Sequence, residues 1–292
     1  MSASPPQLDF CSDHFPVAMS YESDTLSLPL VSFNILNPRY KRYLKLNQGL
    51  EHSKLYTMPL AERYGKVLTI VQDAFDSDVA IVCLQEVSGD FLFTLEKWLL
   101  KKPTLRLLKA GTWDLDTNDW GLMLYDSTKV TVSGCPEIVP FTLPDPAKEA
   151  NTWTESSDSK DYIFSNYMQI VTFVPVSSTA SEPFTVLNCH VKFGQIDQLI
   201  QCMRTLEKRD FKNLIACGDF NVGVGFKDPR PESDSTPLTN AKEFILHLNH
   251  AQDSHFNCFQ EYDLFDHFYT SKNVVMKTQL PLVSLLRKAL KR

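Results

Sequence analysis

The sequence predicts an α/β layered fold, and two observations support this prediction. Short apolar runs typical of buried strands alternate along the chain with segments whose apolar residues have helical spacing. Polar residues repeatedly stand where an apolar run ends, as in Leu214–Asn221, where Leu-Ile-Ala-Cys is followed by Gly-Asp-Phe-Asn. Because strands covered on both faces carry their functional groups at their ends, the pattern also predicts a site at one edge of a sheet.

The composition predicts one large domain over residues 1–292, with residues 1–9 as a frayed N-terminus. Hydrophobic residues make up 43% of the chain, which is enough to bury a large core. The formal net charge of -6 argues against tight non-specific binding of nucleic acid through a broad basic face. Nothing in the sequence indicates a protein partner.

The cysteines and the hydropathy pattern predict an intracellular protein of the cytoplasm or nucleus. The seven cysteines are odd in number and lack paired spacing, which favours a reducing compartment. The sequence has no signal peptide and no apolar run of about 18 residues, so we expect no stable membrane insertion.

The N-terminal half is predicted to begin with a strand hairpin. Apolar and polar residues alternate from Val17 to Glu22, and Ser23–Pro29 is expected to connect this strand to a second one at Leu30–Leu36. The basic, aromatic segment Asn37–Pro59 fits a solvated loop and a substrate-contacting loop equally well. The other elements expected in this half are helices at Leu60–Phe75 and from Leu92 through Leu99, and strands at Val79–Leu84, Gly121–Tyr125 and Lys129–Val132.

The C-terminal half is predicted to continue the alternation after an exposed loop at Pro140–Asp161. The expected elements are strands at Tyr167–Val174, Phe184–Val191 and Asp263–Tyr269, and helices at Gln195–Leu206, Leu238–Leu248 and Leu280–Arg292. The last helix is basic and amphipathic, and we expect it to pack on the core, with a membrane or partner surface as the alternative.

The predicted strand ends carry residues suited to phosphate chemistry. Glu86 is informative because a carboxylate at the end of a buried strand costs free energy unless it is paired or ligates a cation. Asp219 and Asn221 are two residues apart, so one can orient water while the other donates to an anion, although Gly-Asp-x-Asn also fits an ordinary Asx turn. The whole set is Asp13, His14, Asn34, Glu86, Asn188, His190, Asp219, Asn221 and Asp266.

These residues stand in segments that resemble the endonuclease/exonuclease/phosphatase superfamily, the DNase I-like fold of magnesium-dependent phosphoesterases. The resemblance implies a four-layer α-β-β-α sandwich that hydrolyses phosphodiester bonds. The matching segments are Ser32–Leu36, Leu84–Val87, Asn188–Val191, Gly218–Asn221, Phe265–Phe268 and Ser12–Val17, and together they cover most of the chain.

The order of the segments predicts that the chain is circularly permuted. In the family the Ser-Asp-His motif closes the chain, whereas here it stands at residues 12–14, before the first strand. The family's last strand, Phe15–Glu22, would then be joined directly to its first. The competing interpretation keeps the usual order and makes Asp266 and His267 the terminal pair, but only residues 12–17 supply the whole motif.

The resemblance assigns a cation and a general base to the site. Glu86, Asn34 and Asp13 would hold Mg²⁺, with Mn²⁺ as the alternative ion. His14 would be the general base that activates water, and Asp266 would orient it.

The same resemblance places the other polar residues around the phosphate. Asp219 and Asn221 would position the water and hold the phosphate. His190, with Asn188 two residues before it, corresponds to a histidine that contacts the phosphate or assists the leaving group in nuclease-like and deadenylase-like members. Asp119 is the candidate for its carboxylate partner.

The substrate predicted from the resemblance is RNA or DNA. The Asn-Ile-Leu-Asn-Pro segment at 34–38, followed by a basic and aromatic insertion, is similar to the deadenylase-type branch. A phosphoinositide phosphatase or a sphingomyelinase-like enzyme is the alternative, although the phosphoinositide branch usually continues its Gly-Asp motif with Leu-Asn-Tyr-Arg. A binding module that lost the chemistry is a third interpretation, and the retained Glu86 and both histidines argue against it.

Overall fold

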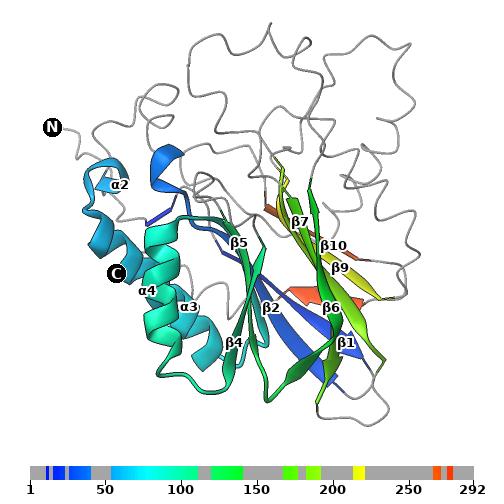
Figure 1. Cartoon of the computed structure of the whole chain (residues 1–292). Helices are drawn as coiled ribbons and strands as arrows, with labels where there is room; N and C mark the ends of the chain where they lie inside the picture. Colours follow the sequence, from blue (N-terminus) through cyan, green and yellow to red (C-terminus); the bar gives the residue numbers. More distant parts are fainter. Residues whose placement is uncertain are drawn as a thin grey trace, which may run out of the picture.

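In a computed structural model of the chain, two β-sheets pack face to face, and helices α3 (Leu60–Asp76) and α4 (Gly89–Leu99) cover the outer face of one of them (Figure 1). The structure describes residues 11–12, 16–23, 26–40, 54–110, 120–140, 167–176, 182–191, 213–220, 266–270 and 275–278. No helix within these ranges is long and apolar enough to cross a membrane.

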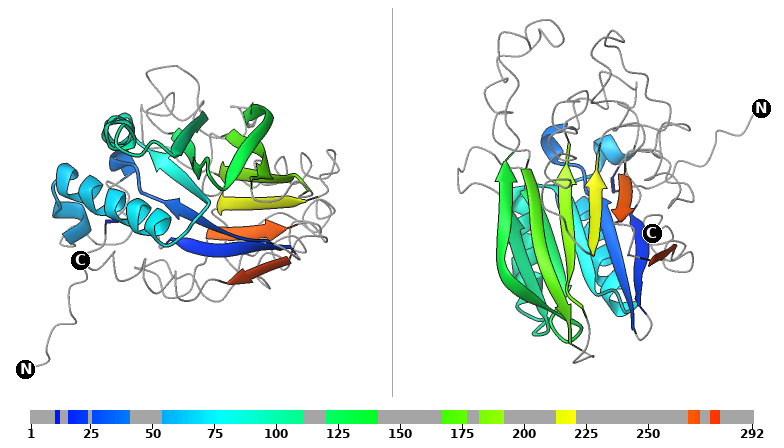
Figure 2. Two further views of the ribbon diagram at one scale, coloured as in Figure 1. Left: turned by 90° about the horizontal axis from the view of Figure 1, so that it is seen from below. Right: turned by 90° about the vertical axis from the view of Figure 1, so that its right-hand side faces the viewer.

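Each sheet mixes parallel and antiparallel pairing. The first sheet has six strands in the order β11 (Val275–Thr278), β1 (Val17–Ser23), β2 (Leu26–Asn34), β3 (Ile81–Val87), β5 (Trp120–Asp126) and β4 (Leu105–Ala110). The second sheet has five, in the order β10 (Asp266–Thr270), β9 (Leu214–Asp219), β8 (Phe184–His190), β7 (Tyr167–Pro175) and β6 (Val130–Pro140). Only β2 with β3 and β8 with β9 pair in parallel among the described strands, and the β8 and β9 arrows point the same way in Figure 2. Two short helical turns, η1 (Pro38–Tyr40) and α2 (Lys54–Thr57), follow β2.

Side chains of strand β3 in the first sheet are buried on both faces in period-two order. In β3, Ile81 and Cys83 belong to the apolar core between the sheets, while Val82 and Leu84 pack against the helices. A strand buried in this way has no polar face, so its sequence reads as a continuous apolar run. The prediction of an α/β layered fold is therefore confirmed.

The second sheet is covered on its outer face as well. Ile215 and Cys217 of β9 face the core between the sheets, and the alternate residues Leu214 and Ala216 are also buried. The helices predicted at Gln195–Leu206, Leu238–Leu248 and Leu280–Arg292 lie outside the described residues, as do residues 1–9 and most of the Pro140–Asp161 loop.

The predicted hairpin of the first two strands is confirmed, but the predicted connector between them is wrong. Strand β1 runs to Ser23 and β2 begins at Leu26, with seven antiparallel pairs from Val17 opposite Ser32 to Ser23 opposite Leu26. Turn-forming residues such as Pro29 favoured a loop here. The burial of Leu28 and Leu30 in the core between the sheets outweighs that local preference.

Gly218 lets strands β8 and β9 approach closely beside the end of the sheet. A Cβ atom at this position would lie 1.9 Å from the backbone oxygen of Cys189, and the φ of Gly218 is +138°. Both the space and the backbone conformation therefore require glycine.

Replacing Gly218 with alanine is expected to lower the free energy of unfolding by about 3 kcal/mol, because the added methyl group forces β8 and β9 apart. Urea unfolding followed by circular dichroism measures the change. Gly65→Ala is the control: nothing lies within 4 Å of its Cβ position in helix α3, and alanine there should add about 0.5 kcal/mol. Equal stabilities for the two variants would contradict the close approach.

Candidate functional site

The core between the sheets changes from apolar to polar at one end. The row that starts with Phe184 and Val186 in β8 continues with polar residues, and so does the row of Ile215 and Cys217 in β9. Parallel pairing sets Asn34 beside Gln85 and His190 beside Asp219, so the ends of these strands meet in one polar layer. The row of Leu28 and Leu30 in β2 and the row of Ile81 and Cys83 in β3 change in the same way. The polar residues of the four rows are Ser32, Asn34, Gln85, Asn188, His190 and Asp219.

A β-bulge turns Glu86 into the same layer. The register of β3 with β5 shifts between Leu84 and Val87, and Glu86 has a left-handed backbone with φ of 57°. Because Leu84 and Val87 both pack on the helix side, the extra residue allows Gln85 and Glu86 to face the interior consecutively. A regular strand would direct Glu86 into the apolar helix layer.

The side-chain amide of Asn34 bridges two carboxylates from opposite sheets. Its Nδ2 donates to Glu86 Oε1 at 2.9 Å and to Asp219 Oδ2 at 2.8 Å. Its Oδ1 accepts from the backbone N–H of Leu36 at 3.0 Å, which fixes the orientation of the amide. The other Glu86 oxygen, Oε2, accepts from the backbone N–H of Asn37 at 2.8 Å. Asn34 and Asp219 are at most 1% exposed and Glu86 is 8% exposed, so the two negative charges are held almost out of water.

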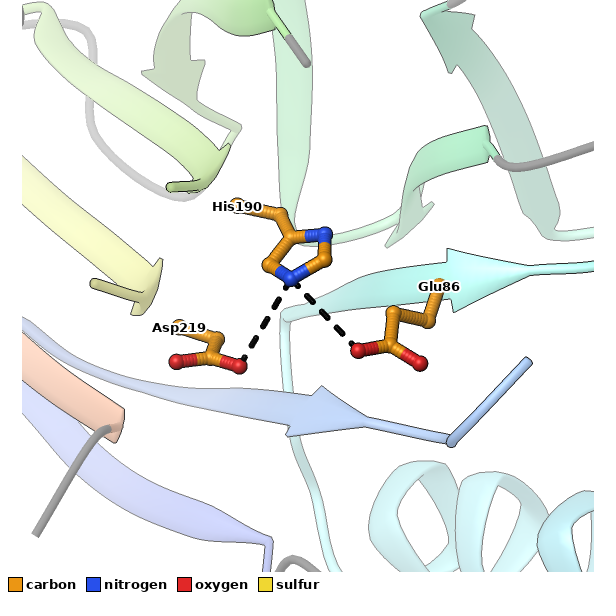
Figure 3. Close-up of side chains that lie close together, drawn as sticks. All are labelled: Glu86, His190 and Asp219. Atoms are coloured by element: carbon orange, nitrogen blue, oxygen red, sulfur yellow. Dashed lines mark ion pairs between the residues drawn. The ribbon is translucent and has the colours of Figure 1, made fainter. Parts of the chain in front are cut away.

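His190 lies over both carboxylates and is the most exposed member of the cluster. Its Nε2 is 3.4 Å from Glu86 Oε1 and 3.8 Å from Asp219 Oδ2, and its side chain is 15% exposed (Figure 3). One ligand atom from each of the three residues lies within 4.8 Å of the others. Two adjacent buried carboxylates repel each other unless a positive charge lies close, so this donor set fits a divalent cation. The oxygen atoms suit Mg²⁺ or Mn²⁺, and the imidazole suits Mn²⁺ better than Mg²⁺.

Comparisons with known proteins identify the fold. No protein-family model and no curated protein matches the sequence. A solved structure of ANGEL2, described as a 2′,3′-cyclic phosphatase, matches with a TM-score of 0.52 and 14% identity over 98% of this chain and 93% of its own. An endonuclease/exonuclease/phosphatase from Bacteroides vulgatus matches with a TM-score of 0.51 and 14% identity over 88% and 87% of the two chains. The fold is that of the endonuclease/exonuclease/phosphatase structures.

The share of each chain that is aligned differs between the two ANGEL2 structures. Another ANGEL2 structure, in complex with adenosine-2′,3′-vanadate, is 17% identical with a TM-score of 0.49 over 86% of this chain. This chain spans 65% of that one, slightly less than two thirds of its length. At 14% identity, the matches with TM-scores of 0.52 and 0.51 show the fold alone.

Asn188 connects the two sheets of the DNase I-like fold beneath the cluster. Its Nδ2 donates to the backbone oxygens of Leu84 at 3.2 Å and Leu122 at 3.1 Å, and its Oδ1 accepts from Gln85 Nε2 at 2.7 Å. The same Gln85 nitrogen donates to Ser32 Oγ at 3.1 Å. Asn188 is 2% exposed. Its hydrogen bonds join the two sheets next to the cluster. Its catalytic role stays a prediction.

The structure brings four of the predicted site residues together, namely Asn34, Glu86, His190 and Asp219. The backbone of Asp266 lies beside them, since strand pairing sets Asp266 opposite Asp219. Four other predicted residues lie outside the described ranges: Asp13, His14, Asp119 and Asn221.

Sequence reasoning missed Ser32, Gln85 and the backbone N–H of Asn37. Ser32 was detectable in principle, because it belongs to the period-two row of β2 that ends in the predicted site residue Asn34. Gln85 was detectable as the polar residue that follows Ile81 and Cys83 in their row of β3. The hydrogen bond from the Asn37 backbone N–H to Glu86 depends on the turn after β2, and no residue pattern indicates this turn.

Asn188→Ala is expected to lower the free energy of unfolding by about 2 kcal/mol, because buried carbonyl groups lose their donor. Asn213→Ala is the matched control: its Nδ2 bonds to Glu182 and Pro183 are at the surface, so its loss should stay within about 0.5 kcal/mol. Chemical denaturation of both variants measures the difference. Similar losses would mean that the Asn188 contacts do not hold the sheets together.

Proposed function

We propose that the protein is a divalent-cation-dependent phosphodiesterase, with Mg²⁺ as the ion and Mn²⁺ as the alternative. The observation that carries the proposal is the buried pair Glu86 and Asp219, which share one amide and have His190 at their open side. A phosphodiester is an anion, and two carboxylates would repel it, so the site requires a cation to admit this substrate. When bound, the cation neutralises charge that grows on the phosphoryl oxygens and the leaving group.

The family resemblance implies Glu86, Asn34 and Asp13 as ligands. Because Asn34 presents its amide nitrogen to the two carboxylates, Asn34 would orient them in this arrangement, and the proposed oxygen ligands are Glu86 and Asp13. Glu86 fits this role because the bulge in β3 aims its carboxylate into the polar layer. The ligating atoms of Asp219 and His190 also lie within reach of the same point, so either can complete the set.

We propose that the chain is a circularly permuted, four-layer, single-domain member of this fold. Two contacts support a meeting of its two end segments at the cluster. Ser12, directly before Asp13, donates its hydroxyl to the backbone oxygen of Asn34 at 2.8 Å. At the other end of the chain, Asp266 pairs with Asp219 across β10 and β9. Segments carrying the proposed base and its orienting carboxylate thus approach the same strand ends.

In the proposed reaction, His14 takes a proton from the attacking water, and Asp266 holds the imidazole in the required orientation. Asp219 and Asn221 position the water and the phosphate. His190 holds a non-bridging oxygen or assists the leaving group from the open side of the cluster, with Asn188 beneath it and Asp119 as its candidate partner.

The proposed substrate is RNA or DNA, cleaved by a nuclease or deadenylase-like activity. Arg39 supports this choice: its Nη2 donates to Tyr40 Oη at 2.7 Å and its guanidinium lies 4.8 Å from the Tyr40 ring centroid, on a turn that follows Asn37. A cation beside an aromatic ring suits a nucleotide strand. ANGEL2 acts on a cyclic phosphate, which is also a phosphodiester, so cyclic nucleotides belong among the substrates to be tested.

We also propose a reducing, intracellular environment. All five cysteines in the described ranges have free thiols, and four of them are buried. Burial raises the pKa of the Cys83 thiol, and its hydrogen bond with Cys217 raises it further, so the Cys83 thiol stays neutral within the core.

Adding Mg²⁺ or Mn²⁺ is expected to raise the melting temperature of the wild type, because the ion relieves the repulsion between Glu86 and Asp219. At a concentration 100 times the dissociation constant the gain is about 2.7 kcal/mol. Glu86→Gln should lose this response and at least about 100-fold of the activity. Glu96→Gln is the control, since Glu96 pairs with Lys109 at the surface. A response retained by Glu86→Gln would remove the proposed cation site.

His14→Ala is expected to lower kcat by about 100-fold or more, because the general base is lost, whereas His267→Ala should keep normal turnover. The assay uses single-stranded RNA and DNA, cyclic nucleotides, phosphoinositides and sphingomyelin, each with and without the cation. The reverse pattern for the two histidines would overturn the permutation. A wild type that binds the cation but cleaves none of these substrates would identify a binding module.

A further inference from the structure

Arg63 of helix α3 is a buried charge whose hydrogen bonds reach two distant segments. Its side chain is 0% exposed, although a guanidinium is costly to remove from water unless it is hydrogen-bonded. Its Nη1 donates to the backbone oxygen of Ile35 at 2.7 Å and to that of Cys11 at 3.2 Å. A residue needed only for packing at this position would be apolar, like its neighbours Val67 and Ile70 on the same helix face.

The two carbonyl groups belong to the two segments that must meet at the proposed site. Ile35 directly follows Asn34, and Cys11 lies next to Ser12, whose hydroxyl donates to the Asn34 backbone oxygen at 2.8 Å. Cys11 and Ser12 are both 0% exposed. The N-terminal segment is therefore attached to the end of β2 twice, once directly through Ser12 and once through Arg63.

We propose that Arg63 is a positioning residue that fixes residues 11 and 12 against the end of β2, and that the activity assigned to Asp13 and His14 depends on this attachment. The inference rests on the proposed function, in which Asp13 and His14 act at this site. A guanidinium nitrogen carries two N–H groups in a rigid plane, so it can hold both carbonyl oxygens at a constant separation.

Cys11 reports directly on the attachment. The Cys11 side chain is 0% exposed, so an alkylating reagent cannot reach its sulfur, and Cys11 should resist alkylation in the wild type. Release of the segment would expose Cys11, while Cys83 and Cys217 in the core between the sheets should stay protected.

The experiment compares wild type, Arg63→Met, Arg63→Lys and Ser12→Ala as full chains loaded with the cation. Arg63→Met should lower kcat about 100-fold, as expected for a misplaced catalytic group, and change KM by no more than about threefold. Arg63→Lys, which keeps the charge and one donor group, should recover part of kcat. Alkylation of Cys11, mapped by mass spectrometry, should rise in the same order as kcat falls.

The control for a general loss of stability is Leu95→Ala, a cavity in helix α4 within the same layer. It should lower the melting temperature while leaving kcat and Cys11 protection unchanged. If Arg63→Met does not fold, Arg63→Lys and Ser12→Ala decide the question with the same two measurements.

The proposal is overturned if Cys11 stays protected in Arg63→Met, or if Cys11 becomes reactive while kcat does not change. These results differ from failure of the proposed function, in which the wild type itself cleaves no substrate. Cys11 alkylation needs no substrate, so it tests the attachment even in that case.

Discussion

The two hydrogen bonds donated by the Asn34 amide are the interaction on which the rest of the site depends. Glu86 belongs to the first sheet and Asp219 to the second, so one neutral side chain joins the sheets at the point where both carry a negative charge. Both bonds are charge-assisted and almost completely shielded from water, which makes them stronger than surface bonds of the same length. The backbone N–H of Leu36 holds the amide so that its nitrogen, rather than its oxygen, faces the carboxylates.

The apolar layers around the site explain how such a charged pair is tolerated. Beneath it, the core between the sheets is filled by aromatic and aliphatic side chains, including the stacked rings of Tyr21 and Phe184, whose centroids are 4.9 Å apart. Packing of this kind resists deformation, so the carboxylates cannot move apart to reduce their repulsion. A cation bound between them would relieve that repulsion.

The sequence alone was sufficient for the layered fold and for four residues of the cluster. Period-two rows with a polar last member, such as the row ending in Asp219, depend only on local alternation and can be recognised without a structure. The bulge at Glu86 could not be predicted, because it depends on the register between β3 and β5. Strand β4 was missed because Arg106 and Lys109 interrupt its apolar pattern. Arg63 would also be assigned to a solvated helix face, since its acceptors on Cys11 and Ile35 are remote in sequence.

The left-handed backbone of Glu86 has a consequence for any attempt to stabilise this protein. An ordinary side chain at φ of 57° costs about 1 kcal/mol relative to glycine. Selection for thermal stability alone would therefore favour glycine at this position. The resulting protein would be more stable but would lack the carboxylate that faces Asn34. Selection for stability and selection for the carboxylate therefore favour different residues at position 86.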